Sequence, residues 1–263
     1  MNCNNEHKVP AMNKRIISVW RRHERVYNSD FLSNAFPPFL EPLILLAGLG
    51  IGFAPYIKTM GNMNYILFLA SGIIVTSSMY TAAFECTYGT FIRLEFDHVY
   101  DGMLGAPLSP HDLIAGEILF AGTKGGFFAL AVLIITWLFG IITYPLSIMA
   151  VLVGFLCGIM FGTVSMWITS FVKNINHFNF FFTGILSPMF FFSGAVFPLK
   201  NLPEIWQMAA EVIPLTHVVR MARAFCVPGQ LGSYLWFDLL YGVIFTLITG
   251  WLAVRGIKRR LID

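Results

Sequence analysis

Long apolar runs separated by short polar connections set the pattern of this chain. Six runs are long enough for a helix to cross the hydrocarbon core of a bilayer, which takes about 17–25 residues. They occupy residues 38–56, 65–84, 113–140, 146–171, 178–197 and 234–254. The pattern predicts an all-α integral membrane protein with six transmembrane helices, in which residues 31–263 form one membrane domain.

Residues 1–30 precede the first apolar run and contain an amphipathic segment. Its apolar side chains recur at the spacing of one helix face, and they are Met12, Ile16, Val19, Trp20, Val26 and Tyr27. Lysine and arginine side chains occupy the other faces. This pattern is typical of a helix that lies in the membrane interface, with Trp20 at the depth of the lipid headgroups. A disordered basic tail is the alternative, and the periodicity argues against it.

The connection between the second and third spans, residues 85–112, is the most polar stretch in the interior of the chain. Four apolar side chains follow the spacing of a short helix, namely Phe96, Tyr100, Met103 and Leu104. Three acids flank that stripe, namely Glu95, Asp97 and Asp101. A solvated hairpin between two spans is the plain alternative. Because such a hairpin needs no apolar face, we expect this cytoplasmic segment to dock on a partner.

A helix-start signal precedes the third span. Ser109 can accept a hydrogen bond from the first turn, Pro110 suits the first helical position, and Asp112 lies near the positive helix end. The sequence therefore predicts that a helix starts at Pro110.

Residues 198–233 form the long connection before the last span. Two apolar stripes at helical spacing occur in it: Ile205, Met208, Ala209 and Val212, and then Val218, Met221, Ala222 and Phe225. Pro203, Pro214 and Pro228 divide the stretch into short helices. Because short amphipathic helices at membrane depth need shielding by protein, we expect them to re-enter the membrane from outside and narrow the outer mouth of a pathway.

Basic residues gather before the first span and after the last one. With six spans, twelve of the 17 Lys and Arg residues fall on the side of the termini, four fall on the other side, and Lys124 lies within a span. The positive-inside rule then places both termini in the cytoplasm. A basic tract can also bind nucleic acid, but one that flanks an apolar span is typical of an orientation signal. We therefore expect no nucleic-acid partner.

The composition excludes an ordinary soluble fold. Hydrophobic residues make up 57% of the 263 residues and charged residues only 12%, against about 25% charged in a typical soluble domain. A soluble fold of this length has no way to hide so much apolar surface from water, whereas a bilayer solvates it.

Motifs for catalysis or for binding a nucleotide are missing from the sequence. No GxxxxGK[ST] occurs, and Gly122-Thr123-Lys124 lacks the spacing of a phosphate-binding loop. HExxH and GxSxG are also absent, and the six histidines and four cysteines show no metal-ligand spacing. We expect this chain to be no enzyme and to hold no metal or cofactor of its own.

Two charged residues lie inside predicted spans, where an unpaired charge is costly. Glu41, near the start of the first span, is either a headgroup-level acid paired with an arginine of the interfacial helix or a functional group. Lys124, in the first half of the third span, either extends back to the cytoplasmic surface or serves a function within the membrane.

The fifth span is rich in phenylalanine, and its rings include Phe181, Phe182, Phe190, Phe191 and Phe192. These rings either fill lipid-facing surface or form a dry aromatic constriction along a substrate pathway. In the second interpretation, Tyr80 and Phe84 of the second span are expected on the same pathway.

Small residues recur every four positions in the fourth span, at Gly154, Gly158 and Gly162. This spacing puts the three glycines on one side of the helix. It predicts that another helix packs closely there.

Several short motifs occur in an order that resembles a known family. They are Pro37-Pro38-Phe39-Leu40-Glu41-Pro42, Ala83-Phe84-Glu85-Cys86-Thr87-Tyr88-Gly89, Leu104-Gly105-Ala106-Pro107-Leu108-Ser109, Gly116-Glu117, Ser187-Pro188, Phe192-Ser193-Gly194-Ala195-Val196-Phe197-Pro198, Leu202-Pro203 and Pro214-Leu215-Thr216-His217. No single motif is specific, but their order and spacing are. Over roughly residues 15–255, the chain resembles the membrane-spanning permeases of type-2 ABC exporters, and most of all the subfamily that exports nodulation lipo-oligosaccharides.

The resemblance implies a homodimer in the bacterial inner membrane, with substrate passing between the two protomers. Two copies of a separate ATPase subunit, which binds ATP and Mg²⁺, are expected on the cytoplasmic face. The helix around Glu95–Ala106, followed by Pro107, corresponds to the coupling helix that contacts this ATPase. Expected substrates are amphiphiles, namely lipid-linked saccharides, polysaccharides, lipids or drugs.

Two other functions compete with that of an ATP-driven exporter. A secondary transporter or channel commonly contains internal repeats or interrupted helices around ionisable groups, and the halves of this chain show no convincing repeat. A membrane enzyme acting on lipid or glycan would use acids and histidines gathered at one interface. The connection between the second and third spans supplies such residues: Glu85, Glu95, Asp97, His98, Asp101, His111 and Asp112.

Overall fold

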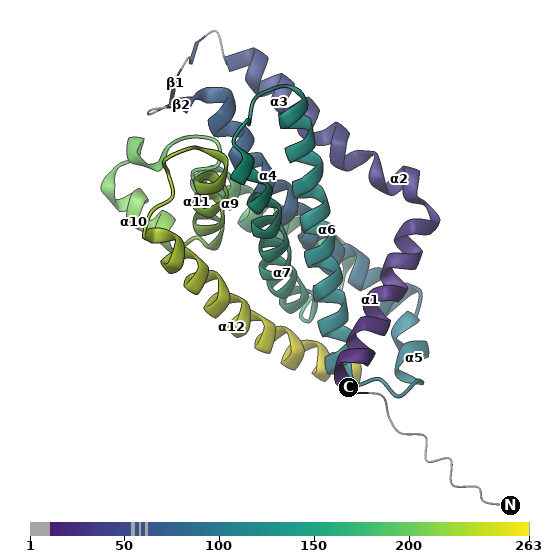
Figure 1. The fold of residues 1–263 in the computed structure, drawn as a ribbon. Helices are drawn as coiled ribbons and strands as arrows, with labels where there is room; N and C mark the ends of the chain where they lie inside the picture. The colour runs from purple at the N-terminus through teal and green to yellow at the C-terminus, as the bar shows by residue number, and fades with distance from the viewer. Residues whose placement is uncertain (1–10, 54–55, 58, 61–62, 263) are drawn as a thin grey trace, which may run out of the picture.

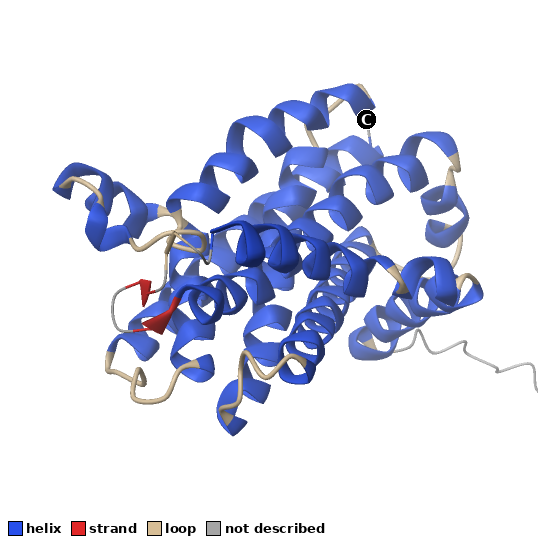
Figure 2. Cartoon of the chain, turned by 90° about the horizontal axis from the view of Figure 1, so that it is seen from above, coloured by secondary structure: helices blue, strands red, loops and turns tan. Residues whose placement is uncertain are grey.

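The structure is a computed structural model that describes residues 11–53, 56–57, 59–60 and 63–262. Helices form almost all of it (Figures 1 and 2), and the sheet found in these residues is one short antiparallel hairpin. The hairpin joins β1 (Thr59–Met60) to β2 (Met63–Asn64), with Thr59 opposite Asn64 and Met60 opposite Met63.

The helices follow one another in a simple order along the chain. The first three are α1 (Met12–Ser29), α2 (Phe31–Ala35) and α3 (Pro37–Phe53). After the hairpin, α4 (Tyr65–Phe84) continues through two π turns, η1 (Glu85–Gly89) and η2 (Ile92–Phe96), and then come α5 (Val99–Leu104) and α6 (Pro110–Leu138). The remaining elements are η3 (Pro145–Ile148), α7 (Met149–Thr169), η4 (Ile175–His177), α8 (Phe178–Phe181), η5 (Phe182–Leu186), α9 (Ser187–Phe192), η6 (Leu199–Asn201), α10 (Glu204–Val212), α11 (Pro214–Cys226) and α12 (Tyr234–Ile262).

Four helices in the described part of the chain are long and apolar enough to cross a membrane. They are Tyr65–Phe96, Pro110–Leu138, Pro145–Thr169 and Tyr234–Leu261. They coincide with four of the predicted spans, although the first of them runs through η1 and η2, well past its predicted end at Phe84. The chain is therefore a multi-pass membrane protein.

The other two predicted spans are not among these four helices. For the predicted span 38–56, α3 has 17 residues and ends at Phe53. The predicted span 178–197 is divided among α8, η5 and α9, and its helical part ends at Phe192. Pro188 explains part of this irregularity because it has no backbone N–H, and the Ser187 hydroxyl donates a hydrogen bond to the Phe182 carbonyl at 2.9 Å. The count of six spans remains a prediction.

Close packing of α6 on α7 forms the centre of the bundle. A Cβ atom added at Gly158 of α7 would lie 2.8 Å from the carbonyl oxygen of Ala121 in α6. One added at Gly125 of α6 would lie 3.0 Å from the carbonyl oxygen of Gly154. The predicted contact along the glycine stripe is thus confirmed, with α6 as its partner. Ser78 of α4 joins the same contact by donating to the Gly125 carbonyl at 2.7 Å.

Both described termini lie at one end of the bundle, and α5 lies at that end as well (Figure 1). We call it the basic end because α1 and the last turns of α12 bring arginine and lysine side chains to it: Arg15, Arg255, Lys258, Arg259 and Arg260. The hairpin, α10 and α11 lie toward the opposite end, which we call the distal end (Figure 1). The six-span prediction places both termini and the connection that contains α5 on the same side of the membrane, and the positions of these segments at one end of the bundle agree with it.

The connection before the last span contains the two short helices that its prolines predict. α10 starts directly after Pro203, α11 starts at Pro214, and Pro228 follows the end of α11. Proline favours a helix start because its missing N–H has no partner there in any case. Re-entry of these helices into a membrane remains a prediction.

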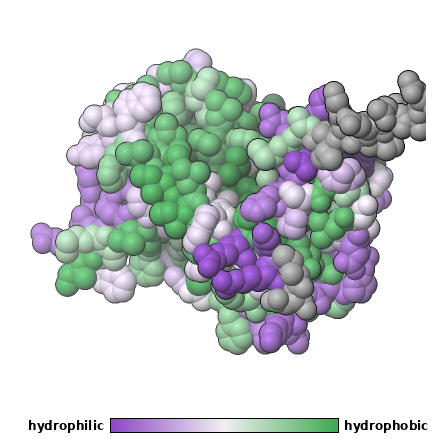
Figure 3. Space-filling model, turned by 90° about the horizontal axis from the view of Figure 1, so that it is seen from below, coloured by the Kyte–Doolittle hydropathy of each residue, from purple (hydrophilic) through white to green (hydrophobic). Residues whose placement is uncertain are grey.

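The outer side of α12 is apolar and exposed. Its exposed side chains are Trp236, Phe237, Leu240, Val243, Ile244, Leu247, Ile248 and Trp251. Seen from below, hydrophobic surface covers much of one flank, and hydrophilic patches gather beside it (Figure 3). An exposed apolar face of this length suits contact with lipid or with another membrane-embedded chain.

Candidate functional site

A group of charged and polar side chains is buried between α1, the extension of α4 and α6. We call it the buried charge cluster, and it comprises His23, Glu85, Thr90, Arg93, Glu117 and Lys124. Its two carboxylates balance its two permanently basic groups. Because isolated charges are expensive to bury, this pairing stabilises the group inside an otherwise apolar bundle.

Arg93 lies between the two carboxylates of the cluster. Its Nη1 donates to Glu85 Oε1 at 2.8 Å, and its Nε donates to Glu117 Oε1 at 3.1 Å. Lys124 Nζ donates to the other oxygen of Glu85 at 2.8 Å. Glu117 is only 1% exposed and also accepts a hydrogen bond from Thr90 Oγ1 at 2.6 Å. Glu85 is therefore held by Arg93 of its own helix and by Lys124 of α6, and Glu117 of α6 is held by Thr90 and Arg93 of the α4 extension.

The two π turns after α4 explain how Glu85 and Arg93 come to face each other. In a regular α-helix, residues eight apart point about 80° away from each other, since each residue advances about 100°. A π turn contains more residues and advances less per residue. Glu85 begins η1 and Arg93 lies at the start of η2, so the stretch from one to the other advances less than a regular α-helix, and the two side chains lie on nearly the same side of one continuous helix.

α1 closes the cluster on its other side. His23 Nε2 lies 3.3 Å from Glu117 Oε1, and Trp20 Nε1 donates to Thr123 Oγ1 of α6 at 3.0 Å. The predicted amphipathic helix is confirmed, and its inner side packs along α6. Its depth relative to lipid headgroups remains a prediction.

The start of α6 has the predicted cap, and α1 holds it in place. The Asp112 backbone N–H donates to Ser109 Oγ at 3.2 Å, while the Ser109 N–H donates to Asp112 Oδ2 at 3.0 Å. Arg15 Nη1 of α1 lies 3.2 Å from the same carboxylate oxygen. One turn further on, a Cβ atom at Gly116 would lie 2.6 Å from the Val19 side chain, so the two helices touch there.

The structure describes the surroundings of only one of the two charged residues predicted inside spans. Lys124 belongs to the buried charge cluster, and its Nζ also lies 5.3 Å from the centre of the Tyr27 ring. Glu85 offers it a partner inside the bundle, and an extension of its side chain to the cytoplasmic surface remains a prediction. Burial and, to a lesser degree, the Glu85 carboxylate raise the pKa of Tyr27. Glu41 is in α3, and its side chain lies outside the described part of the structure.

The apolar stripe of the predicted coupling helix requires a correction. Tyr100 and Met103 are 1% and 9% exposed, and Leu104 is half-buried against the same internal cluster, so this side of α5 packs on its own chain. His98, with a φ of 48° in the left-handed region, turns the chain between η2 and α5. Tyr100, Met103 and Leu104 then point inward, whereas Phe96 of the same stripe, before the turn, stays exposed. The expectation that Tyr100 docks on a partner is wrong for this reason.

The outer side of the same segment is acidic and exposed. Phe96 is 62% exposed, and Asp97, Asp101 and Pro107 are exposed as well. Glu95 pairs with Arg260 of α12 at 2.7 Å, which ties this segment to the end of the last helix. We call Phe96, Asp97 and Asp101 the acidic face of the segment.

The acids and histidines considered for a membrane enzyme are divided among separate contacts. Glu85 belongs to the buried charge cluster and Asp112 to the cap of α6. His98 and Asp101 lie 3.5 Å apart on the exposed surface. Within the described residues, no group of three or more His, Cys, Asp or Glu side chains is arranged to hold a metal ion.

Most of the aromatic residues predicted along a pathway form one face. The Phe84 and Phe182 ring centres are 4.7 Å apart, and those of Tyr80 and Phe190 are 6.2 Å apart. Phe191 follows Phe190 with ring centres 5.1 Å apart and is half exposed. We call these five rings the aromatic face. Whether they line a substrate pathway remains a prediction.

Other rings differ from that expectation. Phe181 is buried in the core, and Phe192 stacks on Trp206 of α10 with ring centres 5.5 Å apart. Tyr88, which sequence reasoning passed over, joins the aromatic face through a stacked contact with Phe84 at 5.1 Å. Its position four residues after Phe84 is a signal that could have found it.

A second ion-pair group, at the distal end and centred on the buried Asp238 and His217, was missed by sequence reasoning. Asp238 of α12 accepts from Arg220 Nε at 2.8 Å and lies 2.8 Å from His217 Nδ1, and both partners come from α11. Arg220 also binds Glu211 of α10 at 2.8 Å. The hydrogen bond with Asp238 raises the pKa of Arg220, so the guanidinium stays charged. The spacing of His217 and Arg220, one helical turn apart, was the available signal.

Comparisons with known proteins identify the family of this chain. The family model for the ABC-2 type transporter matches residues 15–227. Nodulation protein J of Sinorhizobium fredii is 30% identical over 257 residues, which cover 97% of each chain. Nodulation protein J of Rhizobium leguminosarum bv. trifolii is 31% identical over 258 residues, again 97% of each chain.

A more distant relative matches over a shorter stretch. Inner membrane transport permease YadH of Escherichia coli is 21% identical over 202 residues, which cover 77% of this chain and 78% of that protein. The family match spans three of the four membrane-crossing helices found in the described residues and the whole of the buried charge cluster. This chain belongs to the ABC-2 type transporter family, the family whose motif order it resembles.

Proposed function

We propose that this chain is the transmembrane subunit of an ATP-driven exporter whose ATPase subunit is a separate polypeptide. One observation carries the proposal: the acidic face lies on a segment that continues α4 and is tied by ion pairs to two other helices, α6 and α12. Glu95 binds Arg260 of α12, and Arg93, two residues earlier, binds Glu117 of α6. A partner that grips the acidic face can therefore move the ends of α4, α6 and α12 together.

Force from a docked subunit would pass through charged contacts rather than through a flexible loop. Arg93 lies on the continuous helix Tyr65–Phe96, so a displacement at its end acts on a membrane-crossing element directly. The Glu117 carboxylate transmits the same displacement to α6 at 3.1 Å. His23 extends the chain of contacts to α1. This arrangement gives ATP-driven motion a path into the bundle without a nucleotide site in this chain.

The substrate class follows from the aromatic face and from the relatives. Aromatic rings tolerate acyl chains and stack on sugars, so such a face suits an amphiphile better than an ion. Two of the similar proteins are called Nodulation protein J. We infer that the cargo is an amphiphile such as a lipid-linked saccharide, a lipo-oligosaccharide, a polysaccharide, a lipid or a drug. It would pass between two copies of this chain, with their aromatic faces along the pathway.

The membrane and the orientation belong to the same proposal. One relative is called an inner membrane transport permease. The basic end carries the segment that would meet the ATPase, and the positive-inside rule assigns such an end to the cytoplasm. We infer that the chain lies in the bacterial inner membrane with both termini in the cytoplasm.

Charge reversal on the acidic face tests this function. The full chain is affinity-purified from its native cells, and the eluate is assayed for a bound nucleotide-binding subunit and for ATP hydrolysis. We expect the wild type and the control Glu204→Lys, an exposed acid on α10, to retain both. The double variant Asp97→Lys/Asp101→Lys should lose both because a basic patch replaces the docking charge.

Two results would contradict the proposal at different points. If the double variant retains its partner at full stoichiometry, the acidic face is not the docking surface. If the wild-type chain brings down no ATPase and still supports transport driven by an ion gradient, it is a secondary transporter.

A further inference from the structure

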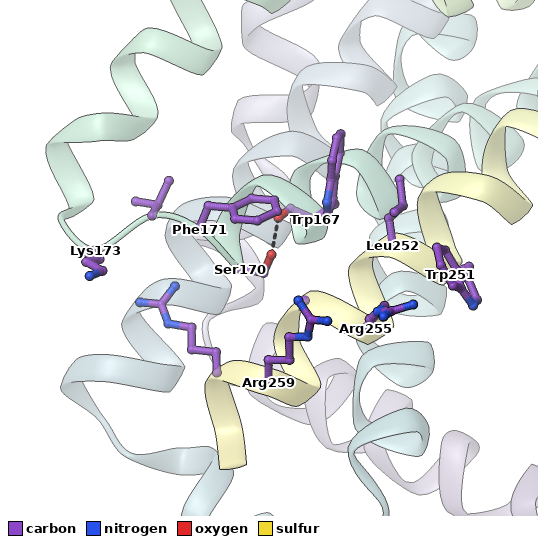
Figure 4. Close-up of a pocket in the computed structure, with 11 residues that line it drawn as sticks. Trp167, Ser170, Phe171, Lys173, Trp251, Leu252, Arg255 and Arg259 are labelled. Atoms are coloured by element: carbon purple, nitrogen blue, oxygen red, sulfur yellow. Dashed lines mark hydrogen bonds between the residues drawn. The ribbon is translucent and has the colours of Figure 1, made fainter. Parts of the chain in front are cut away.

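A groove opens at the basic end between the end of α7 and the last turns of α12 (Figure 4). Its volume is about 550 Å³. Aromatic and basic side chains line it from both sides: Trp167 and Lys173 at the α7 side, and Trp251, Arg255 and Arg259 at the α12 side. The two helices meet at its floor, because a Cβ atom added at Gly256 would lie 2.7 Å from Ser170 Cβ.

Within the described residues, most of the positive charge in this groove has no acidic partner. Arg260, which also lines it, is occupied by Glu95 at 2.7 Å and by the Thr169 carbonyl. Among residues 11–53, 56–57, 59–60 and 63–262, no carboxylate lies within 4.0 Å of a charged nitrogen of Lys173, Arg255 or Arg259. Three cations around one opening attract an anionic group.

The surroundings of the groove indicate that an anionic ligand bound there would also have an apolar part. Trp251 is 60% exposed, and the Arg255 guanidinium lies 5.3 Å from the centre of its ring. From Trp251 the exposed apolar side of α12 continues away from the basic end through Ile248 and Leu247. A tryptophan beside cations, with an apolar stripe on one side, is the arrangement found where a helix passes from hydrocarbon to headgroups.

We propose that this groove binds the phosphate headgroup of an anionic phospholipid from the leaflet at the basic end. The phosphate would lie among Lys173, Arg255 and Arg259, and the acyl chains would follow the apolar side of α12 past Trp251. Free inorganic phosphate shares the headgroup chemistry but gains nothing from the apolar stripe. The site is separate from the acidic face, and Arg260 and Glu95 connect the two.

Quenching of tryptophan fluorescence measures this binding directly. The purified full chain in detergent is titrated with phosphatidylglycerol whose acyl chains are brominated near the headgroup, and with phosphatidylcholine brominated at the same positions. We expect quenching to saturate at a lower concentration of phosphatidylglycerol. Inorganic phosphate in the millimolar range should displace the lipid only weakly.

The double variant Arg255→Gln/Arg259→Gln should lose the preference for phosphatidylglycerol. A basic residue that meets the anionic headgroup contributes about fivefold to the affinity, so we expect the loss of the two groove arginines to weaken binding about 30-fold. Lys258→Gln is the matched control because Lys258 is exposed on the same helix end but does not line the groove. It should keep the wild-type affinity.

Three outcomes would overturn the proposal. They are equal affinity for the two lipids in the wild type, an unchanged phosphatidylglycerol preference in the double variant, and full displacement of the lipid by inorganic phosphate at matched concentration. If the double variant fails to elute as a single species, Lys173→Gln replaces it, since this exposed residue lies on the opposite side of the groove. Lys173→Gln should then bind phosphatidylglycerol about fivefold more weakly than the wild type does.

Discussion

Glu117→Gln tests whether charge balance holds the buried charge cluster together. The amide keeps the size of the side chain but removes the negative charge that Arg93 contacts at 3.1 Å. Arg93 and Lys124 are then left to share Glu85, and His23 loses its carboxylate neighbour. The cluster becomes a buried group with excess positive charge.

The size of the effect follows from burial. Removing one partner of a buried ion pair typically costs about 3–5 kcal/mol because the remaining charge is stranded. For a chain of this size 1 kcal/mol lowers the unfolding midpoint by about 2–4 °C, so the variant should melt about 6–20 °C below the wild type. Glu211→Gln is the matched control, because Glu211 also pairs with an arginine but has a side chain that is 49% exposed. An exposed pair contributes about 0–1 kcal/mol.

The assay is thermal inactivation of the purified chain in detergent. Samples are heated, cooled and chromatographed, and the monodisperse fraction is plotted against temperature. If Glu117→Gln and Glu211→Gln melt within about 2 °C of each other, the reasoning about the cluster is refuted. The double variant Arg93→Met/Glu117→Leu removes one acid and one base together and should regain most of the lost stability.

Three further predictions address other parts of the molecule. Gly158→Ala should cost about 1–3 kcal/mol in the same thermal assay because α6 leaves no room for the methyl group, whereas Gly48→Ala, with no atom within 4 Å, should cost nothing. Asp238→Asn removes the carboxylate that ties α11 to α12, so protease cleavage of the connection at residues 227–233 should accelerate about tenfold or more. Phe84→Ala should slow export severalfold without releasing the ATPase subunit, whereas Phe139→Ala, at a ring that is also more than half exposed but lies away from the aromatic face, should leave export unchanged.

Elements that depend on neighbouring residues were predictable from the sequence. The cap formed by Ser109 and Asp112 and the breaks at Pro203 and Pro214 follow from hydrogen bonds and steric limits within one turn of helix. The periodicity of residues 12–27 predicted α1 for the same reason.

Contacts between distant segments were not predictable in this way. Arg93 and Glu117 are 24 residues apart, and they meet only because two π turns rotate the end of α4. Glu117 itself gave a signal that was not used, since it lies seven residues before Lys124 on the same side of one helix. Likewise, the apolar stripe at Tyr100 shows that one side of α5 is covered, but a stripe does not tell whether the same chain or a partner covers it.

The distribution of charge between the two helices of the buried cluster bears on how the chain enters lipid during synthesis. Glu85 and Arg93 belong to one continuous helix and pair with each other at 2.8 Å. α6 likewise contributes one acid and one base, Glu117 and Lys124. Among the cluster residues, each helix therefore contributes no net charge when it enters the membrane. Neither helix needs the other to cancel a charge in hydrocarbon. When the helices meet, Arg93 keeps Glu85 and gains Glu117, and Lys124 binds Glu85, so the bundle assembles from helices that already balance their charges at this level.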